Sequence, residues 1–270
     1  MTEVVAIHSF KGGNGKSVVA STLAYYTATV LGQKTILVDC DLTAPSLNNL
    51  VSPLKPPEKT LTDLFSPNQD LEEVIQQSNH QNFHLIYAPN PSKGKEFLNQ
   101  DQKWHTKALQ TFFKIKNQLT DNLGYEWIIF DNQSGVSLTA ANFLALSTST
   151  VVLLRPSQYA AEGTLNLCKE IFKRLRLFSE KENRKDLLVW NQIPIGRQET
   201  EVRELIEEWN TLYVEAGVSP IAIIPYMSEL SAAMFLGREN LSVEKIYPFL
   251  APYIETVVEA LSSGFTVAKT

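Results

Sequence analysis

A glycine-rich stretch near the N-terminus, residues 10–17, limits what this chain can fold into more than any other part of the sequence. It follows the apolar run 4–7, which predicts a buried strand, and it precedes residues 18–24, which predict a helix. Glycines let a backbone close around an anion, and the start of a helix favours negative charge. In this setting Lys16 can reach the outer phosphates of a nucleotide and the Ser17 hydroxyl can ligate Mg²⁺. The stretch therefore predicts a phosphate-binding loop.

This loop departs from the strict phosphate-loop pattern in one respect. Phe10 stands where that pattern has glycine, and Lys11 adds a second lysine, so the sequence reads K-G-G-N-G-K-S. The arrangement resembles the deviant Walker A box of the ParA/MinD superfamily of ATPases. The resemblance implies that Lys11 crosses a dimer interface to the partner's nucleotide, so that two copies enclose ATP. The residues of the loop expected to contact the nucleotide are Lys11, Gly12, Gly13, Asn14, Gly15, Lys16, Ser17 and Val18.

Length and composition fit a folded α/β protein. The 270 residues suffice for one large domain, and we expect a single domain, residues 1–270, with a loose tail of about seven residues. The net charge is −5, so any binding to nucleic acid must depend on a local basic patch. Cys40 and Cys168 match no metal or disulfide spacing, and neither a signal sequence nor a long apolar segment is present. We therefore expect a cytoplasmic protein that can associate with the nucleoid.

A second acidic element follows in the middle of the chain. Residues 127–131 form an apolar strand that ends in Asp131, which is the form of a Walker B element. The Asp131 carboxylate is expected beside Mg²⁺, together with Ser17, and the N–H of Gly135 can reach the γ-phosphate. The family usually reads D-x-P-x-G here, whereas residues 131–135 keep the aspartate and the glycine but lack the proline.

Asp41 follows another expected strand at the edge of the sheet where ligands bind. In the family that the chain resembles, an aspartate in this register orients the attacking water and contacts Mg²⁺ through its water shell. The resemblance thus implies a catalytic role for Asp41, beside Lys11 and Lys16, with support from Asp39. The alternative is that Asp41 caps a helix or a turn. Family members often continue with D-P-Q-G-N, whereas residues 42–47 read LTAPSL, which leaves the detail of this segment open.

Three later segments extend the resemblance. Residues 156–163 resemble the P-x-x-Y-x-x-E-G segment of ParA proteins. Asn191 ends an expected strand and matches the family's asparagine that reads the adenine edge. Residues 225–237 match the family element P-x-x-x-x-L-S-x-A-x-x-x-G, whose backbone lies along the adenine. Pro225 and Met227 are therefore expected to contact the base.

Apolar runs and helical spacings together predict the fold class. We expect a doubly wound, mainly parallel sheet flanked by helices on both faces. The expected strands are residues 4–7, 34–39, 83–88, 127–131, 151–154, 186–191 and 221–225. The expected helices are residues 17–31, 61–65, 71–77, 104–120, a helix that follows residue 163 and ends near 178, 199–216 and 243–262. Residues 51–60 and 89–103 are expected to be surface loops.

The resemblance covers nearly the whole chain and implies a ParA-like ATPase. Such a protein forms an ATP-dependent homodimer, binds non-specific DNA, and partitions or positions a plasmid, a chromosome or a protein assembly. An adaptor protein stimulates its Mg²⁺-dependent hydrolysis of ATP. A basic run supplies candidate contacts to the DNA backbone, although such a run is also typical of a solvated face. These candidates are Lys173, Arg174, Arg176, Arg184 and Lys185.

Two alternative functions stay open from the sequence. A MinD-like ATPase positions a complex at the membrane and ends in a basic amphipathic helix, but residues 250–263 carry no lysine or arginine, which makes a membrane partner the weaker interpretation. A non-positioning relative acts as an assembly or accessory ATPase on metal clusters or arsenite. That class needs paired cysteine ligands, which Cys40 and Cys168 do not provide.

Overall fold

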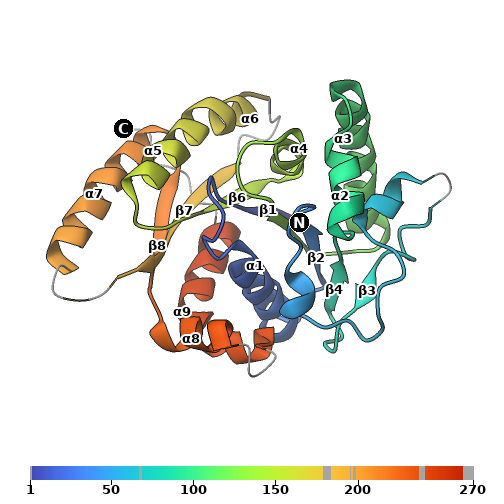
Figure 1. The fold of residues 1–270 in the computed structure, drawn as a ribbon, viewed down its shortest axis with the longest axis horizontal. Helices are drawn as coiled ribbons and strands as arrows, with labels where there is room; N and C mark the ends of the chain where they lie inside the picture. The colour runs from blue at the N-terminus through green and yellow to red at the C-terminus, as the bar shows by residue number, and fades with distance from the viewer. Residues whose placement is uncertain are drawn as a thin grey trace.

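An eight-stranded sheet runs through the part of the chain that the structure describes (Figure 1). The structure is a computed structural model, and it describes residues 2–66, 69–178, 184–194, 196, 199–236 and 241–263. The strands are β1 (Glu3–His8), β2 (Thr35–Cys40), β3 (Gln76–Gln77), β4 (Phe83–Ile86), β5 (Trp127–Asn132), β6 (Ser149–Leu154), β7 (Lys185–Ile193) and β8 (Ser219–Pro225). Their order is β3-β4-β2-β5-β1-β6-β7-β8, and every pair is parallel except β3 and β4. The predicted mainly parallel sheet is confirmed.

Helices cover both faces of this sheet. They are α1 (Lys16–Tyr25), α2 (Pro91–Leu98), α3 (Gln102–Asn117), α4 (Leu138–Leu146), α5 (Gln158–Leu167), α6 (Lys173–Phe178), α7 (Glu199–Glu215), α8 (Ser228–Leu236) and α9 (Val243–Ser262). Single helical turns are η1 (Tyr26–Val30), η2 (Leu47–Asn49), η3 (Leu61–Phe65), η4 (Gln118–Asn122) and η5 (Cys168–Phe172). In Figure 1, α1 and α9 lie below the sheet and α4, α5 and α6 lie above it.

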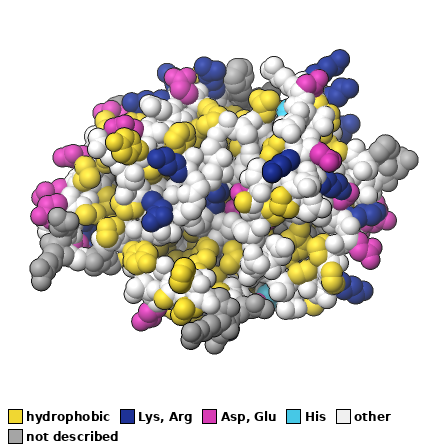
Figure 2. All heavy atoms as spheres, viewed as in Figure 1, with side chains coloured by type: hydrophobic (Ala, Val, Ile, Leu, Met, Phe, Trp, Pro, Cys, Tyr) yellow, Lys and Arg dark blue, Asp and Glu magenta, His cyan; other side chains and the backbone are white. Residues whose placement is uncertain are grey.

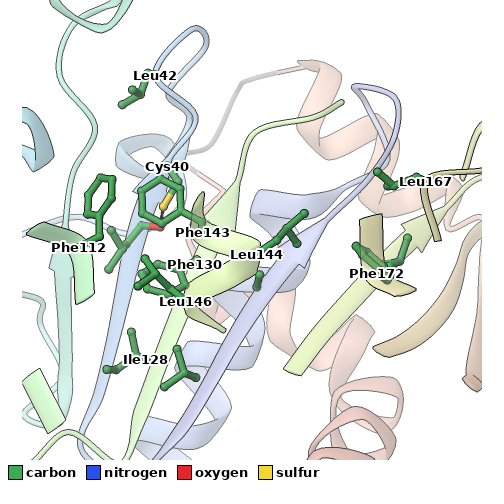
Figure 3. Close-up of a cluster of buried hydrophobic side chains, with 14 of the residues drawn as sticks. Cys40, Leu42, Phe112, Ile128, Phe130, Phe143, Leu144, Leu146, Leu167 and Phe172 are labelled. Carbon is green, nitrogen blue, oxygen red and sulfur yellow. Dashed lines mark hydrogen bonds between the residues drawn. The ribbon is translucent and has the colours of Figure 1, made fainter. Parts of the chain in front are cut away.

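Burial on both faces explains why four of the six residues in each of β2, β5 and β6 are apolar. All six residues are buried in each of β2, β5 and β6, as expected for parallel strands between two layers of helices. On the α3 and α4 side, Phe143 packs against Phe112 and Phe130, with ring centroids 4.6 and 5.1 Å apart. Figure 3 shows this cluster, with Leu42 above Cys40 at the end of β2.

One predicted helix is wrong. Residues 71–77 form a hydrogen-bonded turn in which the Val74 N–H donates to the Leu71 carbonyl at 3.1 Å, and they end in β3. Strand β3 pairs with β4 at the edge of the sheet. The leucine and valine side chains of this segment are buried by tertiary packing and not by the repeat of a helix.

One predicted loop is also wrong. Residues 89–103 contain α2 and the start of α3. Asn90 accepts a hydrogen bond from the N–H of Lys93 at 3.0 Å, and Pro91 occupies the first helical position, where no N–H is required. The polar residues around Lys93 and Gly94, which suggested a loop, therefore belong to a helix that Asn90 and Pro91 start.

Candidate nucleotide-binding site

The strand order brings together three chain segments that follow the C-terminal ends of β1, β2 and β5. β5 lies between β1 and β2, so the loop after β1 and the acidic segment after β2 flank the end of β5. In this register Asp131 lies beside Ile7 on one side and beside Asp39 on the other. The topology therefore assembles residues that are more than 100 positions apart in the sequence.

The phosphate loop, residues 9–17, is held in shape by its own glycines and by two amides. Gly13 and Gly15 have φ of 77° and 83°, a left-handed region that disfavours other residues. The Asn14 side chain donates to the Leu153 carbonyl at 3.0 Å. The Asn191 side chain donates to the Asn14 carbonyl at 2.8 Å. Asn14 is thus a buried structural residue of the loop, and Asn191 anchors the loop from β7.

A cavity of about 590 Å³ opens beside this loop. The residues predicted to contact nucleotide that line it are Gly12, Gly13, Gly15, Lys16, Ser17, Val18, Asp41, Asn191, Pro225 and Met227. It continues toward α8, where Tyr226, Leu230 and Met234 also form its wall. A cavity of this size, lined by apolar side chains at one end and by a lysine and hydroxyls at the other, suits a nucleoside with its phosphates.

Two serines at the phosphate end were not singled out from the sequence. The Lys16 ammonium donates to the Ser134 hydroxyl at 2.6 Å, and the Ser46 hydroxyl donates to the Ser17 hydroxyl at 2.9 Å. Ser134 lies inside residues 131–135, so the spacing of Asp131 and Gly135 could have pointed to it. Ser46 follows a proline in a segment that departs from the family pattern, so no motif pointed to it.

Two buried carboxylates lie side by side beneath the loop. Burial raises the pKa of Asp131 to about 7, although the nearby Ser17 hydroxyl and Lys16 ammonium act in the opposite direction. Burial, and then the charge of Asp131, raise the pKa of Asp39. Both carboxylate oxygens of Asp131, and Oδ2 of Asp39, have no hydrogen-bond partner. Unpartnered carboxylate oxygens beside a serine hydroxyl are the ligand types that Mg²⁺ prefers, so these residues fit the cation.

Asp41 lies at the edge of the cavity, in what we call the switch segment, residues 41–46. Its Oδ1 accepts hydrogen bonds from the N–H of Thr43 at 3.2 Å, the Thr43 hydroxyl at 2.7 Å and the N–H of Ala44 at 3.0 Å. The interpretation of Asp41 as a turn cap thus describes this oxygen. Because the side chain also lines the cavity, the cap fixes the carboxylate in front of the phosphate loop.

Besides Asn14, two more predicted nucleotide contacts are engaged elsewhere. Lys11 is exposed, and its ammonium lies 5.8 Å from the ring centroid of Tyr159 on α5. The N–H of Gly135 donates to the Ser9 carbonyl at 3.0 Å, so this predicted phosphate donor instead joins the end of β5 to the phosphate loop. The last residue of the predicted adenine element, Gly237, and the predicted tail, residues 264–270, lie outside the described residues.

Three of the five predicted DNA contacts hold the fold together. Arg176 pairs with Asp186 and donates to the Ala216 carbonyl at 2.7 Å. Arg184, with a side chain only 4% exposed, pairs with the same aspartate at 3.1 Å. Lys185 donates to carbonyls at the end of α9. The predicted patch is corrected accordingly, since only Lys173 and Arg174 remain as exposed candidates.

One strained residue was also not predicted. Gln192 has φ of 58° at an irregularity between β7 and β8, and it lines the cavity. Left-handed backbone outside glycine is uncommon and gathers at functional sites. No sequence pattern marks this position, which lies where the register of β7 and β8 shifts.

Comparison with known proteins places these features in context. The model of the AAA domain family matches residues 2–186. The sporulation initiation inhibitor protein Soj of Bacillus subtilis is 25% identical over 171 residues, which is 63% of this chain and 65% of Soj. The match thus spans slightly less than two thirds of that relative's length.

Solved structures share the fold at low sequence identity. Apo McdA from Cyanothece has a TM-score of 0.76 at 14% identity, with 97% of this chain and 100% of McdA covered. The septum site-determining protein MinD from Pyrococcus horikoshii, complexed with Mg-ADP, has a TM-score of 0.67 at 17% identity, with 97% and 100% covered. Within the described part of this chain, none of the helices combines the length and apolar character that a membrane span requires.

Proposed function

Because the chain belongs to the AAA-domain family of P-loop ATPases, in its ParA/MinD group, we propose that it is a ParA-like positioning ATPase that hydrolyses ATP in the cavity beside residues 9–17. The observation that carries this proposal is the meeting of Lys16 and Ser17 at the phosphate end of that cavity, with the buried carboxylates of Asp131 and Asp39 side by side beneath them. MinD binds Mg-ADP, and Mg-nucleotide is the ligand that this set of residues suits.

The chain's own residues act mainly by positioning and charge. Lys16 is held in place by Ser134 and neutralises charge on the transferred phosphoryl group. Asp41, fixed by its turn, orients the attacking water. Ser17 and Asp131 would hold Mg²⁺, with Asp41 reaching it through water, and the cation would supply further charge neutralisation.

Two substitutions separate binding from hydrolysis. Lys16→Ala should abolish ATP binding measured by calorimetry, because the phosphates lose their main cation. Asp41→Ala should bind ATP with little change and hydrolyse it slowly, because only water orientation is lost. Lys55→Ala, which changes an exposed lysine outside the cavity, is the control. Equal loss of ATP affinity in the Lys16 and Asp41 variants would contradict these roles.

The proposed dimer encloses two ATP molecules between two copies of the chain. Large apolar side chains are exposed on elements next to the site: Tyr159 beside Lys11 at 77%, Leu138 at the start of α4 at 50%, and Phe235 on α8 at 90%. Figure 2 shows apolar side chains over α8, the helix whose Leu230 and Met234 line the cavity. A second copy would cover these side chains, and Lys11 would then leave Tyr159 to reach the partner's nucleotide. Light scattering of the Asp41→Ala protein should show a dimer with ATP, a monomer with ADP, and no dimer when Lys11→Ala is added.

Non-specific DNA is the proposed surface on which the dimer acts, with an adaptor protein that stimulates hydrolysis. Soj and McdA are the relatives that favour a positioning role over a metabolic one. With Arg176, Arg184 and Lys185 engaged in the fold, Lys173 and Arg174 are the residues to reverse to glutamate. DNA should bind to the protein only with ATP, and salt should weaken this binding. Reversing Lys173 and Arg174 to glutamate should abolish it, and these results together would support the proposed DNA partner. The apolar face of α9 is buried against α1, so we do not propose a membrane role for that helix.

A further inference from the structure

Helix α2 touches the backbone of the switch segment without any side chain between them. A Cβ atom added at Gly94 would lie 2.0 Å from the carbonyl oxygen of Leu42 and 2.9 Å from its carbonyl carbon. Real Cβ atoms do not approach a backbone oxygen so closely. The position of Leu42, one residue after Asp41, is therefore set by the surface of α2 at this glycine.

The close approach explains a residue that is otherwise unfavourable. Glycine inside a helix costs about 1 kcal/mol relative to alanine, and Gly94 is the fourth of eight residues in α2. Its φ is not in the left-handed region, so the helix itself does not require glycine there. What the glycine provides is room for the Leu42 carbonyl.

Contacts on both sides of Gly94 hold α2 in place. One residue before it, the Lys93 ammonium pairs with Asp63 on η3 at 2.6 Å. Three residues after it, the Phe97 ring packs edge-on against Phe65 and Trp104, with centroids 4.9 and 4.3 Å away. A clash at Gly94 would therefore displace the switch segment and not the helix, because the segment continues into exposed residues.

The displaced peptide carries the carboxylate of Asp41 with it. Asp41 caps the turn through Thr43 and Ala44, so the carboxylate and the Leu42 backbone form one rigid unit. The Leu42 side chain of this unit is buried in the core (Figure 3), so the unit shifts at its exposed end, Thr43 and Ala44, and the Asp41 carboxylate that is hydrogen-bonded to both shifts with it. We infer that Gly94 is a positioning residue for Asp41, and that α2 sets the place of the switch segment in front of the phosphate loop. This inference rests on the proposed ATPase function.

Steady-state kinetics of Gly94→Ala test the inference. The value of kcat should fall about 10- to 100-fold, since a displacement of about 1 Å at a catalytic group has an effect of that size. ATP affinity should stay within about twofold, because the atoms nearest to an added Cβ at Gly94 all belong to Leu42 and none to the phosphate loop. In an Asp41→Ala background, Gly94→Ala should cause no further loss of kcat, because its effect passes through that carboxylate. A purely structural role would instead lower thermal stability and ATP affinity together.

A second variant covers the case in which Gly94→Ala does not fold. Lys93→Ala removes the ion pair to Asp63 without adding a clash and should lower kcat in the same direction by a smaller factor. Lys95→Ala, on the exposed side of α2, is the control and should leave kcat unchanged. If Asp41→Ala hydrolyses ATP normally, the proposed role of Asp41 is wrong. If Asp41→Ala is slow while Gly94→Ala and Lys93→Ala keep wild-type kcat, or lose affinity as much as kcat, the inference is overturned.

Discussion

The phosphate loop and the switch segment meet at the same cavity but are held in different ways. The loop is fixed by its own glycines and by amides that bind its backbone, such as Asn191. The switch segment is fixed by one carboxylate cap and by α2, which lies about 50 residues further along the chain. Substitutions in the phosphate loop should therefore change nucleotide binding, whereas substitutions in the switch segment or α2 should change hydrolysis.

Of the substitutions that compare these two regions, we expect the largest effect from one in the phosphate loop. Gly15→Ala should weaken ATP binding at least about 100-fold, because it adds left-handed strain and places a Cβ 2.7 Å from the Asn191 amide. Gly13→Ala is the matched variant, since Gly13 has a similar φ but no atom within 4 Å of the added Cβ. Calorimetric titration with ATP should show a smaller loss for Gly13→Ala. Equal losses would mean that Asn191 does not brace the loop.

A second experiment concerns the two buried carboxylates, Asp131 and Asp39, beneath the phosphate loop. The pKa of Asp131 is raised to about 7 from an ordinary value of 3.8, so the folded protein holds this proton more tightly than the unfolded chain does. Its contribution to stability is therefore greatest at low pH and is lost as the pH rises toward 7. Asp131→Asn should stabilise the nucleotide-free protein by on the order of 2 kcal/mol at pH 8, and by less at pH 5.

Urea denaturation of both proteins at the two pH values measures this effect. Asp39→Asn gives a comparison at the neighbouring strand position. A wild-type protein that is more stable than Asp131→Asn at pH 8 would show that the unpartnered carboxylate does not destabilise the fold.

A third variant compares Gly163, which faces the phosphate loop, with Gly94, which faces the switch segment. At Gly163 on α5, an added Cβ would lie 2.4 Å from the Phe10 ring, whereas at Gly94 it would meet backbone. A ring can move, so Gly163→Ala should cost about 1–2 kcal/mol of unfolding free energy and reduce ATP affinity only a few-fold. Phe10→Leu should restore stability in the Gly163→Ala background. The comparison fails if Gly163→Ala lowers kcat as Gly94→Ala does while leaving affinity intact.

The smallest effect concerns the outer end of the loop. Tyr159→Leu removes the ring beside the Lys11 ammonium, while Tyr159→Phe keeps it. An exposed contact of this kind is worth about 0.5–1 kcal/mol, so the leucine variant should form the ATP dimer two- to fivefold more readily. Sedimentation with ATP gives the dissociation constants of the dimer. Identical values for the two variants would show that Tyr159 does not retain Lys11.

Local sequence predicted the parts of the site that depend on local chemistry. The loop glycines, Lys16 and the apolar strands follow from residue type and spacing alone, and the strands are confirmed. The contact between Gly94 and Leu42 could not be predicted, because a glycine in a polar segment is typical of a loop, and the residue that requires this glycine, Leu42, lies on another segment. The basic run failed for a related reason, since Arg184 pairs with the neighbouring Asp186 but also binds carbonyls near 40 positions away in the sequence.

The placement of β5 between β1 and β2 also orders events during synthesis of the protein. The first two strands emerge from the ribosome with α1 between them, yet neither pairs with the other in the finished sheet. Each must wait for residues 127–132, so two apolar strands stay without their central neighbour while about 90 further residues are translated. The same order that builds the nucleotide site thus leaves the nascent chain open to chaperones and to aggregation until Asp131 has been made.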